Sequence, residues 1–434
     1  MTAETVGIVA LIVMLALMLL RIPIAISMVL PAMAGILYLK NWNVLATSVE
    51  TIIWSKSMNY TLSTIPMFVL MGEMLTFSGI SSELYSSFRT WFGKLKGGLG
   101  MATIGASAVF AAASGSSIAN TGTIGVMASK EMLKAGYSKA LTGGSIVAGG
   151  SLGILIPPST FLILYGMMTE QSIGKLLTAG IIPGILLAIL FVITISIVAK
   201  IKPEMAPGGE SASWKERFVS LKSTFWILLL FIVVIGGMFI GVFGPTEAAG
   251  IGALCATIMA WLKKKLTWQV FKEAVLRTCI TSGFIYAIII SAFLFNYLLT
   301  ISKVPLLIST SLAEANLPKA ITFILIVIMY VLLGAVMDSM AAVVVTVPII
   351  MPILLNYDFN LIWFGIVMCL LVEVALISPP HGMNIMILNG VVPELQLEKI
   401  FAGALLFMIP IFLLVFLLYL FPEIVLFLPD RMAG

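Results

Sequence analysis

Long apolar runs recur throughout this chain of 434 residues, and they limit its fold more than any other feature. Hydrophobic residues make up 61% of the sequence and charged residues only 10%, and the mean hydropathy is +1.16. So few charges could not solvate a soluble domain of this size, and a backbone in lipid must satisfy its hydrogen bonds within each segment, as an α-helix does. The sequence therefore predicts an all-α polytopic membrane protein.

Breaks in these runs predict short paired helices in addition to simple spans. The two longest runs, 6–39 and 224–262, are interrupted at Arg21-Ile22-Pro23 and at Gly244-Pro245. Proline and glycine at these points favour a turn between two helices. Counting these pairs, we expect about ten transmembrane helices and two re-entrant hairpins. Runs with the length of a single span fall at 62–79, 140–168, 176–199, 279–301, 361–390 and 400–421.

The two halves of the chain resemble each other on either side of a polar linker, 200–223. PIAISM, which begins at Pro23, matches PTEAAG at Pro245, and ILIPPSTF at Ile154 matches LISPPHGM at the same offset of 222. SGSS at 114–117 aligns with Met337-Asp-Ser-Met340 one residue further on. Several features in one order at one offset indicate an internal duplication.

The charges that flank matching segments indicate that the two halves are inverted. Lysines and arginines lie on both sides of 224–262, whereas 6–39 carries Arg21 at its turn. Lys94 and Lys96 precede the SGSS region of the segment 99–138, and Lys130, Lys134 and Lys139 follow it. Because cytoplasmic loops are enriched in Lys and Arg, these charges place the turn of 6–39, the ends of 224–262 and the ends of 99–138 on the cytoplasmic side. Inverted repeats with broken helices are typical of secondary transporters.

SGSSIAN, residues 114–120, then falls at the tip of a re-entrant hairpin near the middle of the bilayer. The next span is broken at Gly153-Ile-Leu-Ile-Pro157-Pro158-Ser159, where two prolines remove amide donors and free carbonyls. Hydroxyl and carbonyl oxygens suit Na⁺, and the exposed N-termini of half-helices suit an anionic substrate. The candidate ion ligands are Ser114, Gly115, Ser116, Ser117, Gly153 and Pro157, with Asp338, Ser339, Ser378, Pro379 and Gly382 in the second half. The candidate substrate ligands are Asn120, Ser159, His381 and Asn384.

A structural interpretation competes with each of these assignments. Small residues and serines line ordinary helix contacts in membranes, and paired prolines also kink helices for structural reasons. Duplication of both features in one order favours a site. Asp338 aligns with the tip and is expected to coordinate an ion or substrate. For Glu373 both roles remain open, either bonding amides freed at the break or serving function directly.

The chain closely resembles the large membrane subunit of the tripartite ATP-independent periplasmic (TRAP) transporters. The resemblance covers nearly the whole sequence. It is carried by IPMFVLMGEML (65–75), GGLGMATIGASAVFAAASGSSIAN (97–120), GGSLGILIPPS (149–159), GPTEAAGIGAL (244–254), MDSMAAVVVTVPIIMPI (337–353) and EVALISPPHGMN (373–384). Ser378, His381 and Gly244 depart from the residues commonly found at their motif positions, which leaves the specific substrate open.

The resemblance implies an elevator-type transporter in the bacterial inner membrane that is driven by a Na⁺ gradient, with two or more Na⁺ sites. It also implies a small four-helix membrane subunit, a soluble periplasmic protein that delivers the substrate, and an organic acid anion as the substrate. Amphipathic stretches near 44–58 and 264–277 are expected to lie along the membrane surfaces. The expected scaffold comprises 1–98 and 224–318. The expected transport domain comprises 99–199 and 319–421, with hairpins at 99–138 and 319–357, broken helices at 140–168 and 361–390, and a tail at 422–434.

Two alternatives remain at this point. A stand-alone Na⁺/carboxylate symporter of similar architecture would need no soluble binding protein. An intramembrane serine hydrolase would pair Ser116 or Ser117 with His381. The duplication counts against the hydrolase, because the counterpart of His381 is Ser159. The sequence contains no basic, aromatic-rich stripe, so we expect no nucleic-acid partner.

Overall fold

The computed structural model describes the whole chain except residues 210–211, 315–316, 335–336, 381 and 433–434. The described residues form helices joined by turns and loops, with no strand among them. Six of these helical segments are long and apolar enough to cross a membrane, and the bent pair 214–222 and 224–239 would make a seventh. Further apolar helices are too short to span alone, as expected where a run is broken at a turn.

The first half begins with helices that surround the first predicted break. Arg21 adopts a left-handed φ of 63° between α1 and α2, so the interruption predicted at Arg21-Ile22-Pro23 is confirmed. The first elements are α1 (Ala3–Leu19), α2 (Ile24–Leu39), α3 (Trp42–Ser57), α4 (Thr64–Phe77) and α5 (Ile80–Phe92).

The segment predicted as a hairpin and a broken helix follows. Two antiparallel helices meet at Gly115, and the next helix stops at Ser151 and resumes at Thr160. These elements are α6 (Gly98–Ser114), α7 (Ser117–Lys134), α8 (Lys139–Ser151), a 3-10 turn η2 (Leu152–Ile154), α9 (Thr160–Thr169), α10 (Ile173–Ala179) and α11 (Ile181–Ile201).

The linker between the halves is shorter than predicted. We expected 200–223, but α11 continues to Ile201 and α12 begins at Trp214. The hydroxyl of Ser213 accepts a hydrogen bond from the backbone N–H of Glu216, and the Glu216 carboxylate accepts one in return from the Ser213 N–H. This capping box starts the helix within a polar segment.

The second half repeats the order of the first with one clear difference. The predicted break at Gly244-Pro245 is confirmed, because α14 begins at Pro245. The difference is α15, a continuous helix of 34 residues that includes 268–277. The stretch 264–277, predicted to lie along a membrane surface, is therefore not a separate helix, whereas 44–58 largely corresponds to α3. The elements are α12 (Trp214–Phe231), α13 (Gly237–Phe239), α14 (Pro245–Leu262), α15 (Trp268–Ile301), α16 (Val304–Glu314), α17 (Lys319–Gly334), α18 (Ser339–Asn356), α19 (Leu361–Ile377), α20 (Met383–Val391), α21 (Leu397–Leu420) and α22 (Glu423–Leu426).

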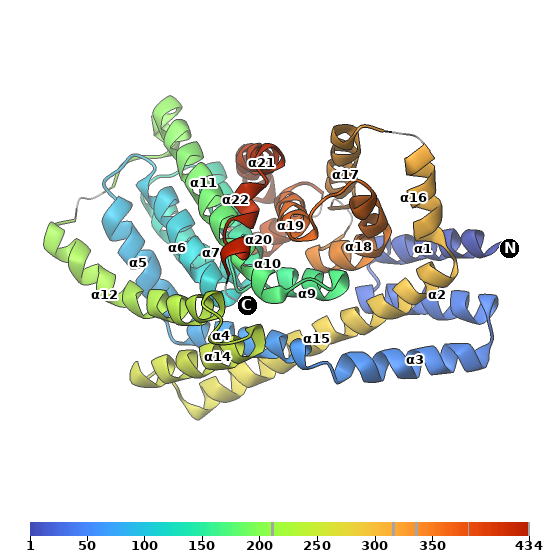
Figure 1. Cartoon of the computed structure of the whole chain (residues 1–434). Helices are drawn as coiled ribbons and strands as arrows, with labels where there is room; N and C mark the ends of the chain where they lie inside the picture. The colour runs from blue at the N-terminus through green and yellow to red at the C-terminus, as the bar shows by residue number, and fades with distance from the viewer. Residues whose placement is uncertain (210–211, 315–316, 335–336, 381, 433–434) are drawn as a thin grey trace.

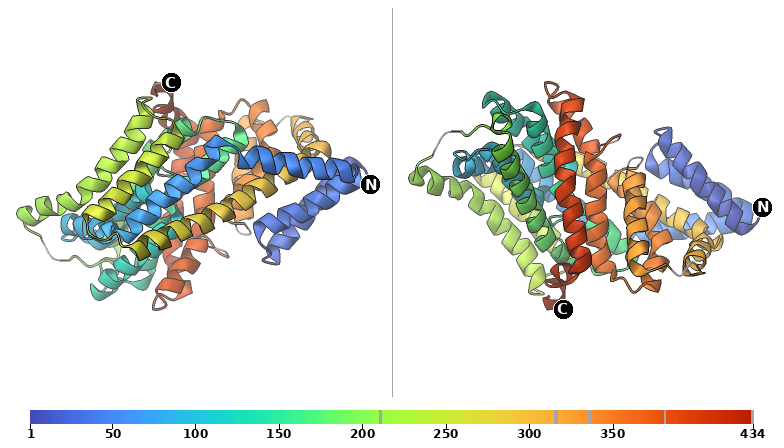
Figure 2. Two further views of the ribbon diagram at one scale, coloured as in Figure 1. Left: turned by 90° about the horizontal axis from the view of Figure 1, so that it is seen from below. Right: turned by 90° about the horizontal axis from the view of Figure 1, so that it is seen from above.

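Helix packing brings the two halves together crosswise. α7 of the first half packs against α20 of the second, and α18 of the second packs against α9 of the first. α8 packs closely along α21, where a Cβ on Gly144 would lie 2.6 Å from the backbone carbon of Gly403. Figure 2 shows α21, in red, running along this part of the molecule and the N-terminus at a distant end.

A second group of helices lies along the other face. α15 crosses the molecule beside α2, α3 and α4, and α14 packs along α4 (Figure 1). α5 and α12 pack against each other and against α6. α4 also packs against α6, so α15 is connected to the first hairpin through α4.

Candidate functional site

The tip of the first helix hairpin is a tight turn built around Gly115. Its φ of 60° is left-handed, and an added Cβ would lie 2.6 Å from the carbonyl oxygen of Pro158. Glycine alone tolerates both the dihedral angle and the close approach. The Ser116 hydroxyl then accepts a hydrogen bond from Ala119 N at 3.3 Å and caps α7. The N-terminus of α7, with its partial positive charge, therefore lies at the tip.

The break in the following helix is held open by its own side chains. The Ser159 hydroxyl accepts a hydrogen bond from Leu162 N at 3.2 Å, which caps α9, and it donates one to the carbonyl oxygen of Ile154. The peptide bond between Pro157 and Pro158 is cis. The Ser159 side chain is therefore engaged in the geometry of the break, although we predicted it as a substrate ligand.

The tip and the break of the first half lie against each other. The Thr160 hydroxyl donates a hydrogen bond to the carbonyl oxygen of Gly115 at 3.3 Å. A Cβ on Gly153 would lie 2.7 Å from the carbonyl carbon and oxygen of Ser116. The structure thus brings together the first-half residues that the sequence proposed as ion ligands, Ser114, Gly115, Ser116, Ser117, Gly153 and Pro157.

The second half has the same parts with a carboxylate at its tip. Asp338 caps α18 by accepting a hydrogen bond from Ala341 N at 2.8 Å. Ser339 begins α18, and α19 ends at Ile377 with Ser378 as its cap. The peptide bond between Pro379 and Pro380 is cis, and Gly382 has a left-handed φ of 41° at the start of α20.

The second tip and break are placed near each other through α17 and α19. A Cβ on Gly334, the last residue of α17, would lie 2.2 Å from the Cβ of Ala375. Ala375 lies in the last turn of α19, directly before the break. The predicted substrate ligand His381 lies outside the described residues.

The two predicted asparagines are fully buried on elements that pack together, α7 and α20. Asn120 Nδ2 donates to the carbonyl oxygens of Ser107 at 3.0 Å and Gly149 at 3.3 Å, so it ties α7 to α6 and α8. Asn120 Oδ1 and both polar atoms of the Asn384 side chain have no hydrogen-bond partner within the described part of the chain. These atoms are free to bind a ligand or water.

Two residues of α19 lie beside the site, Glu373, which the sequence had already raised, and Cys369, which it had not. The Cys369 thiol donates to the carbonyl oxygen of Ile154 at 3.2 Å, which links the second half to the break of the first. Glu373 lies one turn further on the same helix face and is fully buried. Neither of its carboxyl oxygens has a hydrogen-bond partner among the described residues, which exclude residue 381 of the break. The i, i+4 spacing was the only sequence signal for Cys369.

Oxygen atoms are the main potential metal-ion ligands at both tips. The described residues contain no cluster of three or more His, Cys, Asp or Glu side chains able to hold a metal ion. Hydroxyls, backbone carbonyls and one tip carboxylate are hard ligands that suit a small monovalent cation.

Comparison with known proteins identifies the chain. Residues 11–424 match the family described as tripartite ATP-independent periplasmic transporter, DctM component. The chain belongs to this family. It is a multi-pass membrane protein, and its named relatives are transport permeases rather than enzymes. Membership also implies a partnership with a small membrane subunit and a periplasmic binding protein.

Three relatives illustrate the family. The C4-dicarboxylate TRAP transporter large permease protein DctM of Pseudomonas aeruginosa is 33% identical over 78% of this chain and 79% of its own length. The DctM protein of Vibrio cholerae is 30% identical over 98% of this chain and 97% of its own. The sialic acid TRAP transporter permease protein SiaT of Haemophilus influenzae is 29% identical over 97% of this chain and 68% of its own.

A solved structure supports the fold alone. The YdaH transporter of Alcanivorax borkumensis aligns with a TM-score of 0.61 and 14% identity, covering 88% of this chain and 90% of that one. The fold class predicted from sequence, an all-α membrane transporter, agrees with this likeness.

Proposed function

We propose that this TRAP large permease carries a small organic acid anion across the bacterial inner membrane together with Na⁺. The observation that carries the proposal is the contact of Gly115 with the carbonyl of Pro158, which joins a hairpin tip to a helix break. The second half repeats these parts in the same order. Paired tips and breaks of this kind collect unwound carbonyls and helix N-termini, which are the means by which transporters hold ions and anions.

We assign one Na⁺ site to each tip and break. The first would use oxygens of Ser114–Ser117 and of the Gly153–Pro157 segment, all of them uncharged. The second would use Asp338 and Ser339 with the segment Ser378–Gly382. A carboxylate offsets the cost of removing water from a cation, so we expect the two sites to differ in their sensitivity to substitution.

The substrate would lie between these sites, where several half-helices begin. α7, α9, α18 and α20 start next to the two tips and breaks, and α7 packs on α20 while α18 packs on α9. Their N-terminal partial charges favour an anion. The unpartnered side-chain atoms of Asn120 and Asn384 would orient it by hydrogen bonds. Related permeases are named for C4-dicarboxylates, sialic acid and 2,3-diketo-L-gulonate, all of them acids.

Movement would occur between two groups of helices in an elevator mechanism. Residues 99–199 and 319–421 would move, and residues 1–98 and 224–318 would stay fixed. α6, α7 and α8 pack on one another and α8 packs on α21, while α2, α4, α14 and α15 pack together in the other group. The fixed group would bind the small four-helix subunit, and a periplasmic protein would deliver the substrate.

Reconstitution tests this proposal against the stand-alone symporter. Proteoliposomes with the large and small subunits should take up a labelled organic acid only with an inward Na⁺ gradient and only when the periplasmic protein is present. Equal uptake without that protein would favour the stand-alone symporter. Uptake that ignores the Na⁺ gradient would contradict ion coupling.

The serine hydrolase has no support in the site. The Ser116 hydroxyl caps α7. The relatives of this chain are named as permeases. A Ser116→Ala variant should retain uptake measurably above background, because a cap substitution weakens a helix without removing a nucleophile.

A further inference from the structure

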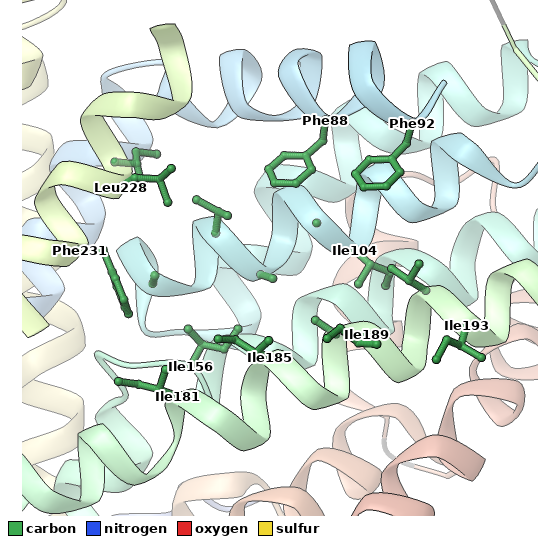
Figure 3. A pocket seen from close by; sticks show the side chains of 17 residues that line it. Phe88, Phe92, Ile104, Ile156, Ile181, Ile185, Ile189, Ile193, Leu228 and Phe231 are labelled. Carbon is green, nitrogen blue, oxygen red and sulfur yellow. The ribbon is translucent and has the colours of Figure 1, made fainter. Parts of the chain in front are cut away.

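An open apolar groove runs between α5 and α12 on one side and α6 and α11 on the other. It has a volume of about 440 Å³. Phe88 and Phe92 of α5 and Leu228 and Phe231 of α12 line it together with residues of α6 and α11 (Figure 3). Ile185 and Ile189 on its α11 side are 53% and 49% exposed. In a bilayer, a cleft with these walls fills with hydrocarbon rather than water.

The groove ends at the break of the first half. Ile156, which directly precedes Pro157, lines its inner end. A smaller adjacent space is lined by Pro158 together with Ala112 and Phe231, and these last two also line the groove. A molecule lying in the groove would therefore reach the residues that hold the first tip in place.

The other end of the groove continues to a cluster of polar groups without partners. A second cavity of about 280 Å³ shares Phe88 and Phe92 with the groove and is also lined by Trp91 and Thr224. The guanidinium carbon of Arg217 lies 6.0 Å from the centre of the Trp91 ring. Trp91 Nε1, Arg217 Nε and Thr224 Oγ1 all lack a hydrogen-bond partner within the described residues.

Charge around this end of the groove is positive. Arg217 forms none of the ion pairs found among the described residues. Four exposed lysines lie on the two helices that line this end of the groove or directly after their ends: Lys94 and Lys96 follow α5, and Lys215 and Lys222 belong to α12. The nearby Glu216 is engaged by the Ser213 N–H at 2.7 Å and the Ser213 hydroxyl at 2.8 Å. Lysine and arginine at this density are typical of the cytoplasmic side, whose leaflet carries anionic lipids.

We propose that this groove binds an anionic phospholipid of the cytoplasmic leaflet, with the phosphate at Arg217 and one acyl chain along α5, α6, α11 and α12. The lengths agree. Residues 217–231 of α12 extend over roughly 20 Å at about 1.5 Å per residue, and one leaflet measures about 20 Å from its headgroups to the bilayer centre. An acyl chain of a phospholipid whose phosphate binds Arg217 thus reaches Phe231 and Ile156. Any effect of the bound phospholipid on movement between the two helix groups rests on the proposed function, whereas the binding of the phospholipid does not.

Lipid binding can be measured without any transport assay. The full-length chain is purified in mild detergent, stripped of lipid, and mixed with equal amounts of phosphatidylglycerol and phosphatidylcholine for native mass spectrometry. We expect phosphatidylglycerol to bind more tightly to the wild-type protein. Arg217→Gln should weaken phosphatidylglycerol about fivefold and abolish the preference. The matched control Lys215→Gln removes one exposed charge on the same helix and should change affinity less than twofold, roughly.

A second variant tests the acyl chain. Ala108→Phe places a ring in the groove from α6 and should reduce binding of both lipids equally, whereas Leu254→Phe on the exposed face of α14 should leave binding unchanged. Elution profiles and thermal unfolding exclude misfolded variants. In the unaltered protein, phosphatidylglycerol with a photoactivatable acyl chain should crosslink to 104–112 and 185–193. Crosslinks confined to other segments, or equal affinities for Arg217→Gln and Lys215→Gln, would overturn the proposal, whether or not the protein transports an acid.

Discussion

The two tip-and-break pairs share their parts but differ in how they are held and charged. In the first half, Gly115, Ser116 and Gly153 make close backbone contacts with the opposite segment, and every side chain at the tip is neutral. In the second half a carboxylate, Asp338, caps the helix that leaves the tip. Both pairs use close packing, at Gly115 in the first half and at Gly334 in the second, and only the second adds a charge at its tip. Substitutions that separate packing from charge should affect the two halves unequally.

The largest effect should come from adding a methyl group to the first tip. Gly115→Ala forces an alanine into a left-handed φ of 60° and places its Cβ 2.6 Å from the Pro158 oxygen. We expect uptake in proteoliposomes to fall by about tenfold or more, because the dihedral alone costs about 1–2 kcal/mol. Gly122→Ala in α7 is the matched control, since its Cβ would meet only Ile387 at 3.9 Å. Equal activity of the two variants would show that the tip does not need close packing.

Removing the charge from the second tip should have the next largest effect. Asp338→Asn keeps an acceptor for Ala341 N and so preserves the cap of α18, which isolates the charge. We expect the Na⁺ concentration for half-maximal uptake to rise by about tenfold, because a charge-assisted ligand is lost. Asn360→Asp, at the cap of α19, makes the reverse exchange away from the tip, changes the charge by one unit of opposite sign, and serves as the control. An unchanged Na⁺ activation curve for Asp338→Asn would show that Asp338 coordinates no Na⁺.

A neutral ligand in the first half should matter less. Ser117→Ala removes one hydroxyl from a set of uncharged oxygens, so we expect the half-maximal Na⁺ concentration to rise only about two- to threefold. The comparison with Asp338→Asn is the informative measurement, because it compares an uncharged site with a charged one. A larger effect for Ser117→Ala than for Asp338→Asn would reverse the proposed division between packing and charge.

The smallest effect on ion coupling should come from His381, which stays a prediction from sequence. His381→Val should change which acid is carried, or its apparent affinity, by about two- to fivefold while Na⁺ activation stays nearly constant. Competition between labelled C4-dicarboxylates and sugar acids in the same vesicles measures this preference. Loss of Na⁺ activation at unchanged substrate affinity would instead assign His381 to the ion site.

Much of the local structure was predictable because it depends on residues near one another in sequence. Pro23, Pro245 and the two Pro-Pro pairs interrupt helices through their missing N–H groups, and the structure has breaks at all of them. Gly115 and the serine after it predicted the turn between α6 and α7. The limits of the linker were less predictable, because the Ser213–Glu216 capping box extends α12 into polar sequence.

Contacts between distant segments could not be read in the same way. Ser159 and Asn120 have side chains typical of ligands, but the structure uses Ser159 to hold the break and the Asn120 amide nitrogen to join α6, α7 and α8. Cys369 donates to Ile154 across the two halves, a contact that joins residues 215 positions apart. The sequence also suggested a surface arm at 264–277, but residues 268–277 are the first part of α15, because nothing within Trp268–Ile301 interrupts the helix.

The amino-acid sequence by itself determined that the protein is helical and membrane-embedded, that its halves repeat, and where its helices break. Each of these follows from burial of apolar side chains or from backbone geometry over a few residues. Only the tertiary structure decided which tip meets which break, that α7 packs on α20 and α18 on α9, and that a groove stays open between Phe88 and Ile189. These features arise because small residues such as Gly115 and Gly153 let distant backbones approach, and that closeness depends on the packing of the whole molecule.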